Sequence, residues 1–100
     1  MAEYSMYVKF TPVGEYIRIL VLKRLADQGP AGVGEIDRMV KEAVETLGVR
    51  YDWRIWPRLL SKEVEIKDEV VKITSFGMWI LEQTGDEVEN YVRKFLGVTP

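Results

Sequence analysis

The sequence contains no cysteine and no histidine. The absence of cysteine excludes disulfides and thiol catalysis, and the absence of both residue types removes most zinc sites and the commonest general base. Serine occurs only at positions 5, 61 and 75, and none of the three lies in a G-x-S-x-G turn. No clustered carboxylates lie in a loop that would close on a metal ion. We therefore expect no enzyme, no metal site and no cofactor.

Long apolar runs are also missing. No stretch approaches the ~20 apolar residues that a membrane-spanning helix needs. The N-terminus, MAEYSMYVKF, lacks the basic cluster and apolar run of a signal peptide. We therefore expect a cytoplasmic protein with no membrane partner. Asparagine and glutamine are scarce as well, with one and two residues, and this scarcity resembles the composition of thermophilic proteins.

The residues that are present fit one globular domain. The chain has 100 residues, of which 47% are hydrophobic and 30% are charged. This balance is typical of a folded domain, and we expect a single domain over 1–100. The net charge is −2 and the pI is about 5.2. Because nucleic-acid binders are usually basic overall, such a function here requires a locally basic surface.

The beginning of the chain predicts a strand and then a helix. Alternating residues in the stretch YSMYVKF indicate a strand. We expect a strand or extended arm over 1–11, with Tyr4 and Tyr7 either in that arm or in a dimer interface. Thr11 and Pro12 supply a capping hydroxyl and a proline at the first helical position. They predict a helix over about 12–28.

The middle of the chain predicts two further helices and a hairpin. The stretch GPAGVG lacks the lysine and hydroxyl of a phosphate-binding loop, and we interpret it as a turn. Apolar spacing predicts a second helix over about 35–47, stopped by Gly48, and a third helix within 53–62. Two β-rich runs in 64–73 predict a hairpin. Its polar turn lacks Asn-Gly chemistry, which leaves the turn geometry open.

The end of the chain predicts two more helices. Thr74-Ser75 caps the first of them, in which Phe76, Trp79 and Ile80 would be apolar anchors. Gly85-Asp86 is predicted to interrupt or restart the helix, so that a separate C-terminal helix covers 86–97. The order of the elements predicts a mainly α fold with a small β-hairpin, the winged helix-turn-helix. Its core would lie over 12–84.

The third helix contains a proline within a helical pattern, in WRIWPRLLSK. On a wheel of ~100° per residue, the tryptophans share one face, and Arg54 and Arg58 lie on the opposite one. Pro57 has no amide hydrogen and disfavours helical angles in the residue before it. We therefore expect either a short helix that starts near 54–57 or a kink. Arg58 is then helical, whereas Arg54 lies in the helix or in the turn before it.

The outer face of this helix carries the predicted binding residues. In a helix-turn-helix, the third helix offers its outer face to the major groove, where arginine contacts guanine edges or phosphates. Three acids in the hairpin, Glu65, Asp68 and Glu69, are unfavourable near phosphate, so the hairpin would contact DNA through Lys67 or Lys72, or not at all. Ordinary solvation of a charged face is the alternative. We predict duplex DNA binding by these residues: Arg50, Tyr51, Arg54, Arg58, Ser61, Lys62, Lys67 and Lys72.

The tryptophans and the C-terminal apolar residues can each be interpreted in two ways. Trp53, Trp56 and Trp79 all fit apolar faces, which favours core packing over stacking on single-stranded bases. The C-terminal apolar stripe either folds back on the core or pairs with the same helix of a second chain. A homodimer would read two half-sites. The predicted dimerisation residues are Val88, Tyr91, Val92, Phe95 and Leu96.

Two short motifs carry a family resemblance. WPRLL, residues 56–60, resembles the aromatic-proline-x-leucine core of the recognition helix in PadR-like transcription regulators. VKITSFG, residues 71–77, resembles the strand-threonine-x-x-glycine that ends the wing in winged-helix regulators. The usual glycine after the recognition helix is replaced by Lys62-Glu63-Val64. Over about 15–84, the resemblance implies transcription regulation through DNA binding by Arg54, Arg58 and the preceding turn.

Two functions of different classes remain open from the sequence. The first is a small DNA-binding regulator. The second is a winged-helix module that binds a protein partner in a larger complex and does not bind DNA. The acidic pI and the acidic hairpin favour the second function, whereas a continuous positive surface around Arg54 would favour the first.

Overall fold

The structure, a computed structural model, describes residues 11–100. The predicted N-terminal strand or arm, including Tyr4 and Tyr7, lies outside the described residues. The chain is mainly helical with a small three-stranded antiparallel sheet. In chain order, its elements are α2 (Pro12–Gln28), β1 (Ala31–Gly32), α3 (Val33–Thr46), α4 (Ile55–Leu59), β2 (Val64–Lys67), β3 (Val70–Ile73) and α5 (Ser75–Leu96).

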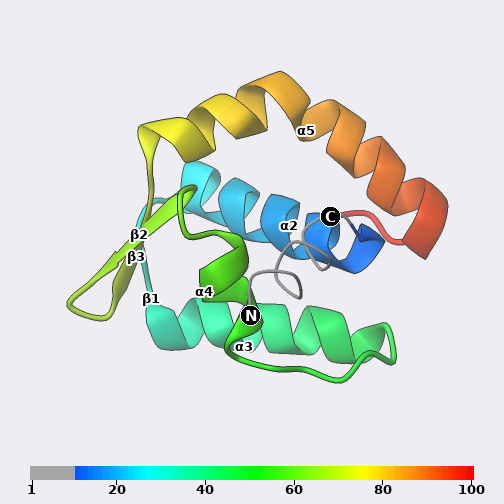
Figure 1. Ribbon diagram of the computed structural model, residues 1–100, viewed down its shortest axis with the longest axis horizontal. Helices are drawn as coiled ribbons and strands as arrows, with labels where there is room; N and C mark the ends of the chain where they lie inside the picture. The colour runs from blue at the N-terminus through cyan, green and yellow to red at the C-terminus, as the bar shows by residue number, and fades with distance from the viewer. Residues whose placement is uncertain (1–10) are drawn as a thin grey trace.

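Helix α2 lies in the middle of the molecule and confirms the prediction for 12–28. The Thr11 hydroxyl oxygen accepts a hydrogen bond from the Gly14 amide at 3.0 Å, and Pro12 occupies the first turn. The helix ends at Gly29, where φ is 83°. Figure 1 shows α5 arching over one side of α2, with α3 and α4 on the other side. Because it is covered on both sides, α2 is the central packing element.

The sheet corrects the prediction of a simple turn in GPAGVG. Strand β1 lies within this stretch and pairs with β3, with Ala31 opposite Val71, and the strand order is β1-β3-β2. A two-residue strand has too little alternation to be detected from sequence. The hairpin turn itself consists of Asp68 and Glu69, whose φ values of 52° and 62° are both positive, as in a type I′ turn. The predicted hairpin is therefore confirmed, with a tight turn.

Helices α3 and α4 lie on the side of α2 that faces away from α5 (Figure 1). Helix α3 begins two residues before the predicted 35 and buries Ile36, Val40 and Val44. Gly48, at φ 76°, follows the helix as expected. Helix α4 is a single short turn that begins at Ile55, within the predicted interval 54–57. Pro57 is its third residue, where a backbone amide has no acceptor inside the helix. The proline therefore costs no hydrogen bond.

Helix α5 is continuous, so the predicted interruption at Gly85-Asp86 and the separate helix over 86–97 are wrong. Thr74 caps the helix by accepting a hydrogen bond from the Gly77 amide at 3.0 Å, and Gly97 ends it at φ 69°. Gly85 is buried where α5 crosses α2. The packing against α2 maintains the helix through a residue with poor helix propensity. Thr84 donates a hydrogen bond to the Ile80 carbonyl at 2.8 Å, a contact that bends helices, and α5 is curved in Figure 1.

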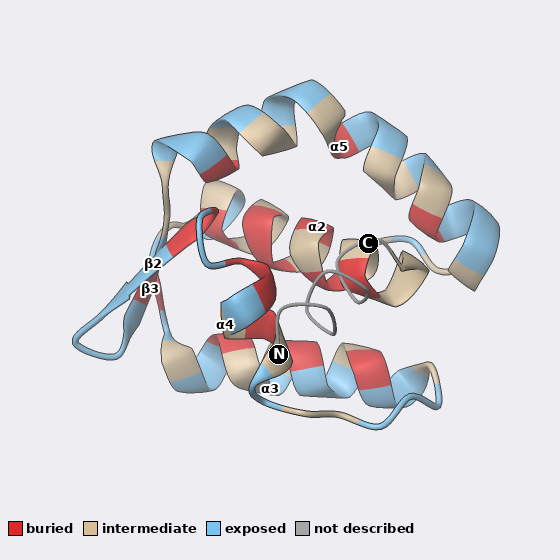
Figure 2. Cartoon of the chain, in the orientation of Figure 1, coloured by how far each residue is buried: buried red, intermediate tan, exposed pale blue. Residues whose placement is uncertain are grey.

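The core lies between the two helical layers and the sheet, as the buried positions in Figure 2 show. Trp56 is its largest fully buried side chain. The prediction that all three tryptophans pack in the core is wrong for the other two. Trp53 is 65% exposed and Trp79 is 55% exposed. Trp53 precedes α4, so the helical wheel does not apply to it, and the half-buried Ile80 packs against the core in place of Trp79.

Candidate nucleic-acid interface

Most of the predicted DNA-binding residues lie on the surface around α4 and the hairpin. Arg50 is in the loop before α4, Arg54 caps the helix, and Arg58 is on its outer side. Ser61 and Lys62 follow α4, while Lys67 and Lys72 lie on β2 and β3, and these seven side chains are exposed. Figure 2 shows that the outer side of α4 and the hairpin are exposed.

Arg58 is directed outward by the burial of its neighbours. Trp56, Leu59 and Leu60 are at most 4% exposed and anchor α4 on the core. Arg58 projects from the opposite side of the same turn. Among the ion pairs between described residues, none includes Arg58. Its guanidinium is therefore a cation presented to solvent, with donors suited to a phosphate or a guanine edge.

Arg54 is in a different electrostatic situation. Its Nε lies 3.0 Å from Asp52 Oδ1 and its Nη2 lies 2.8 Å from Asp52 Oδ2, so the pair is bidentate. The Arg54 amide also donates to Asp52 Oδ1 at 3.0 Å. These hydrogen bonds lower the pKa of Asp52 to about 2. The carboxylate is thus ionised at neutral pH and compensates the Arg54 charge locally, whereas no ion pair between described residues includes Arg58.

Tyr51 is held by the fold rather than presented to solvent. It is half-buried, and its hydroxyl donates a hydrogen bond to Oδ1 of Asp37 on α3. Burial, followed by this hydrogen bond, raises the pKa of Tyr51 well above its usual value. The indole Nε1 of Trp56 donates to the same carboxylate oxygen at 3.1 Å. The side chain therefore positions the loop before α4, and the assignment of Tyr51 to the binding surface stays a prediction.

Asp37 is the functional residue that the sequence did not identify. A usable signal existed nevertheless, since a buried tryptophan requires an acceptor for its indole N–H. Asp37 fixes both the loop before α4, through Tyr51, and the orientation of α4 on α3, through Trp56.

The turn after α4 is clamped to the start of α5. The backbone amide of Thr74 donates to the Glu63 carbonyl at 3.0 Å. The Thr74 hydroxyl lies 2.8 Å from the Lys62 carbonyl and 3.1 Å from that of Glu63. Gly77 packs so closely on the Glu63 carbonyl that a Cβ would overlap it. This contact sets the position of Lys62 relative to the hairpin.

The charges in the hairpin are mixed. Lys72 lies directly opposite Glu65 in the β2–β3 register, whereas Lys67 lies opposite Val70. A cross-strand pair of opposite charges is attractive, so Glu65 compensates Lys72. Lys67 has no acid opposite it, but it lines the same surface hollow as Glu65 and Asp68.

The predicted dimerisation residues divide between core and surface. Val92 is fully buried in this chain, which corrects its assignment to a dimer interface. Val88, Tyr91 and Leu96 are half-buried, and Phe95 is 57% exposed. The Tyr91 and Phe95 rings are 4.9 Å apart. Helix α5 therefore folds back on α2, and among the predicted dimerisation residues it leaves mainly Phe95 exposed.

Comparisons with protein-family models, characterised proteins and solved structures give no match to this chain. Within residues 11–100, no group of acidic side chains is arranged to hold a metal ion. None of the helices in that part of the chain has the length and apolar character needed to cross a membrane. The geometry of the surface around α4 is therefore the basis for a functional proposal.

Proposed function

We propose that this domain is a winged helix-turn-helix that binds duplex DNA and regulates transcription. The order of its elements supports the proposal. Helix α2 is followed by β1, α3, α4 and the β2–β3 hairpin, and β1 pairs with β3. The pairing attaches the hairpin beside the helix pair. In such an arrangement α4 is the third helix, which is the position of a recognition helix. The resemblance to PadR-like regulators is consistent with this proposal.

The observation that carries the proposal is the contrast between the two sides of α4. Its inner side is buried through Trp56 and Leu59, and its outer side presents Arg58 without an ion-pair partner among the described residues. With five residues, α4 is only ~7.5 Å long. A helix of this length spans few base pairs. We therefore propose that phosphate contacts supply most of the affinity, and that a homodimer involving Phe95 supplies additional sequence discrimination.

The test is salt-dependent binding to a mixed-sequence duplex, measured by fluorescence anisotropy. Arg58→Gln is compared with Arg93→Gln, which removes an exposed arginine from α5 whose side chain, within residues 11–100, donates to Asn90 Oδ1 at 3.2 Å. We expect Arg58→Gln to weaken binding about 5- to 100-fold if the contact is to a base, or to reduce the salt slope by about 1 if it is to a phosphate. Arg93→Gln should leave binding unchanged. Equal effects of the two variants, or no duplex binding at low salt, would exclude the proposal.

A protein-interaction module is the second candidate, and an exposed aromatic pair favours it. Phe76 and Trp79 are 43% and 55% exposed on α5. Their rings stack, with centroids 6.1 Å apart and planes inclined by 23°. Aromatic side chains are enriched at the centres of protein interfaces. Under this alternative the wild-type protein would not bind duplex DNA at low salt.

A further inference from the structure

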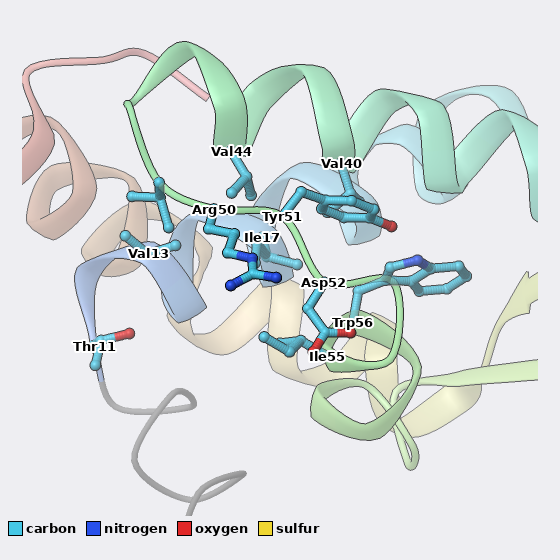
Figure 3. A pocket seen from close by; sticks show the side chains of 11 residues that line it. Thr11, Val13, Ile17, Val40, Val44, Arg50, Tyr51, Asp52, Ile55 and Trp56 are labelled. Carbon is cyan, nitrogen blue, oxygen red and sulfur yellow. The ribbon is translucent and has the colours of Figure 1, made fainter.

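A pocket on the side of α2 away from α5 has a composition that indicates a ligand. Its volume is about 170 Å³, and it lies between α2, α3 and the loop that leads into α4. Figure 3 shows side chains from all three segments directed into it. Its wall is mainly aliphatic, with one indole face. The apolar residues that form the wall are Val13, Ile17, Val40, Val44, Val49, Ile55 and Trp56, and Thr11 and Tyr51 also line it.

Two charged residues, Arg50 and Asp52, line the same pocket and make it asymmetric. Asp52 is already engaged by the bidentate contact with Arg54, at 2.8 and 3.0 Å. No ion pair between described residues includes Arg50. In Figure 3 the Arg50 guanidinium lies among the lining side chains, near Ile17 and Asp52. The charge that remains for a ligand is therefore positive and lies beside an apolar wall.

The volume limits the size of the ligand. An apolar cavity of about 150 Å³ accommodates benzene, so a pocket of about 170 Å³ fits one six-membered ring or a branched chain of similar size. Its wall offers few hydrogen-bonding groups to the ring. A sugar or a nucleotide would lose hydrogen bonds to water without replacement here. The ligand should be apolar apart from one anionic group.

We propose that this pocket binds a compact apolar monocarboxylate, with its hydrocarbon part against Val13, Val49 and Ile55 above buried Trp56 and its carboxylate on Arg50. The assignment follows from the size of the pocket, its largely apolar wall and the excess positive charge that remains because Arg50 and Arg54 share one carboxylate, that of Asp52. It stands independently of the proposed DNA binding. A guanidinium–carboxylate contact is a charge-assisted hydrogen bond, which gives the anion an advantage over a neutral molecule of the same shape.

Trp56 provides the signal for a direct test. In the Trp53→Phe, Trp79→Phe double variant, it is the only remaining tryptophan, and both replaced side chains are exposed. The probe is cyclohexanecarboxylate, which does not absorb where tryptophan is excited. For a ligand with so few atoms, we expect a saturable change in Trp56 emission with a Kd on the order of 1 mM. The neutral analogue cyclohexylmethanol should bind about 10-fold or more weakly.

The charge is tested by substitution at Arg50, which is exposed and so is not expected to disturb folding. We expect Arg50→Gln to weaken the carboxylate about 10-fold and to leave the alcohol unchanged, and Arg50→Lys to restore part of the affinity. Arg93→Gln on α5 is the control. The proposal would be overturned by the absence of saturation at concentrations about 10 times the expected Kd. Equal affinities for acid and alcohol, or an unchanged Kd in Arg50→Gln, would also overturn it.

Discussion

The same substitution at two buried glycines of α5 is expected to have opposite effects on stability. Gly77 and Gly85 are both buried in this helix. A Cβ at Gly85 would lie 3.5 Å from Leu81 Cδ1 and 3.9 Å from Ile19 Cδ1, which are ordinary van der Waals separations. A Cβ at Gly77 would overlap the Glu63 carbonyl oxygen and lie 2.9 Å from Ile73 Cγ1. Gly85→Ala therefore has room for its methyl group, and Gly77→Ala does not.

The magnitudes follow from helix propensity and packing. Replacing glycine by alanine within a helix stabilises it by about 0.5–1 kcal/mol, because glycine loses more conformational freedom on folding. At Gly85 nothing opposes this gain. At Gly77 the obstructing Glu63 carbonyl is backbone that accepts the Thr74 amide at 3.0 Å, so it cannot move without breaking that bond. Overpacking of this kind costs about 1–3 kcal/mol. Because Gly77 lies in the first turn, its propensity gain is too small to offset this cost.

Urea denaturation followed by circular dichroism measures both variants on one scale. We expect Gly85→Ala to raise the free energy of unfolding by about 0.5–1 kcal/mol and the melting temperature by roughly 2–8 °C. Gly77→Ala should lower the free energy of unfolding by about 1–2 kcal/mol with an unchanged m value. The reasoning is refuted if Gly85→Ala destabilises the protein, or if the two changes have the same sign.

Two further substitutions test the hairpin and the support of α4. Glu69→Gly places glycine where φ is 62°, and we expect stabilisation of about 1 kcal/mol in the same urea assay. A loss of stability would contradict the type I′ turn. Asp37→Ala removes the acceptor shared by Tyr51 and Trp56, and we expect a loss of about 1–3 kcal/mol with altered Trp56 fluorescence. An unchanged free energy of unfolding would show that the two donors find other acceptors.

The helix boundaries that the sequence predicted are those with strong local signals. Thr11 and Pro12 begin α2, Thr74 begins α5 and Gly97 ends it, because each of these residues caps a helix through its own hydroxyl or backbone angle. The outward position of Arg58 was also predictable, since burial of Trp56 determines which side of one helical turn faces solvent.

The features that the sequence did not predict depend on contacts between distant segments. Strand β1 exists because Ala31 pairs with Val71, forty positions away along the chain. Helix α5 continues through Gly85 because α2 packs against it there. Trp79 is of a residue type that usually packs in a core. It is exposed here because the packing of α5 on α2 turns it outward. Local propensity is a weak indicator at such positions.

Helix α4 derives its position from anchoring rather than from its length. A helix of five residues is far too short to be stable by itself, so the burial of Trp56 and its bond to Asp37 must hold it. Pro57 is compatible with this anchoring because the first turn needs no amide donor at that residue. The same helix has Ile55 and Trp56 on the pocket and Arg58 on the outer surface. A change in the packing of Trp56 would therefore move the cation proposed to contact DNA, so the proposed ligand pocket and the proposed DNA surface share one small, displaceable element.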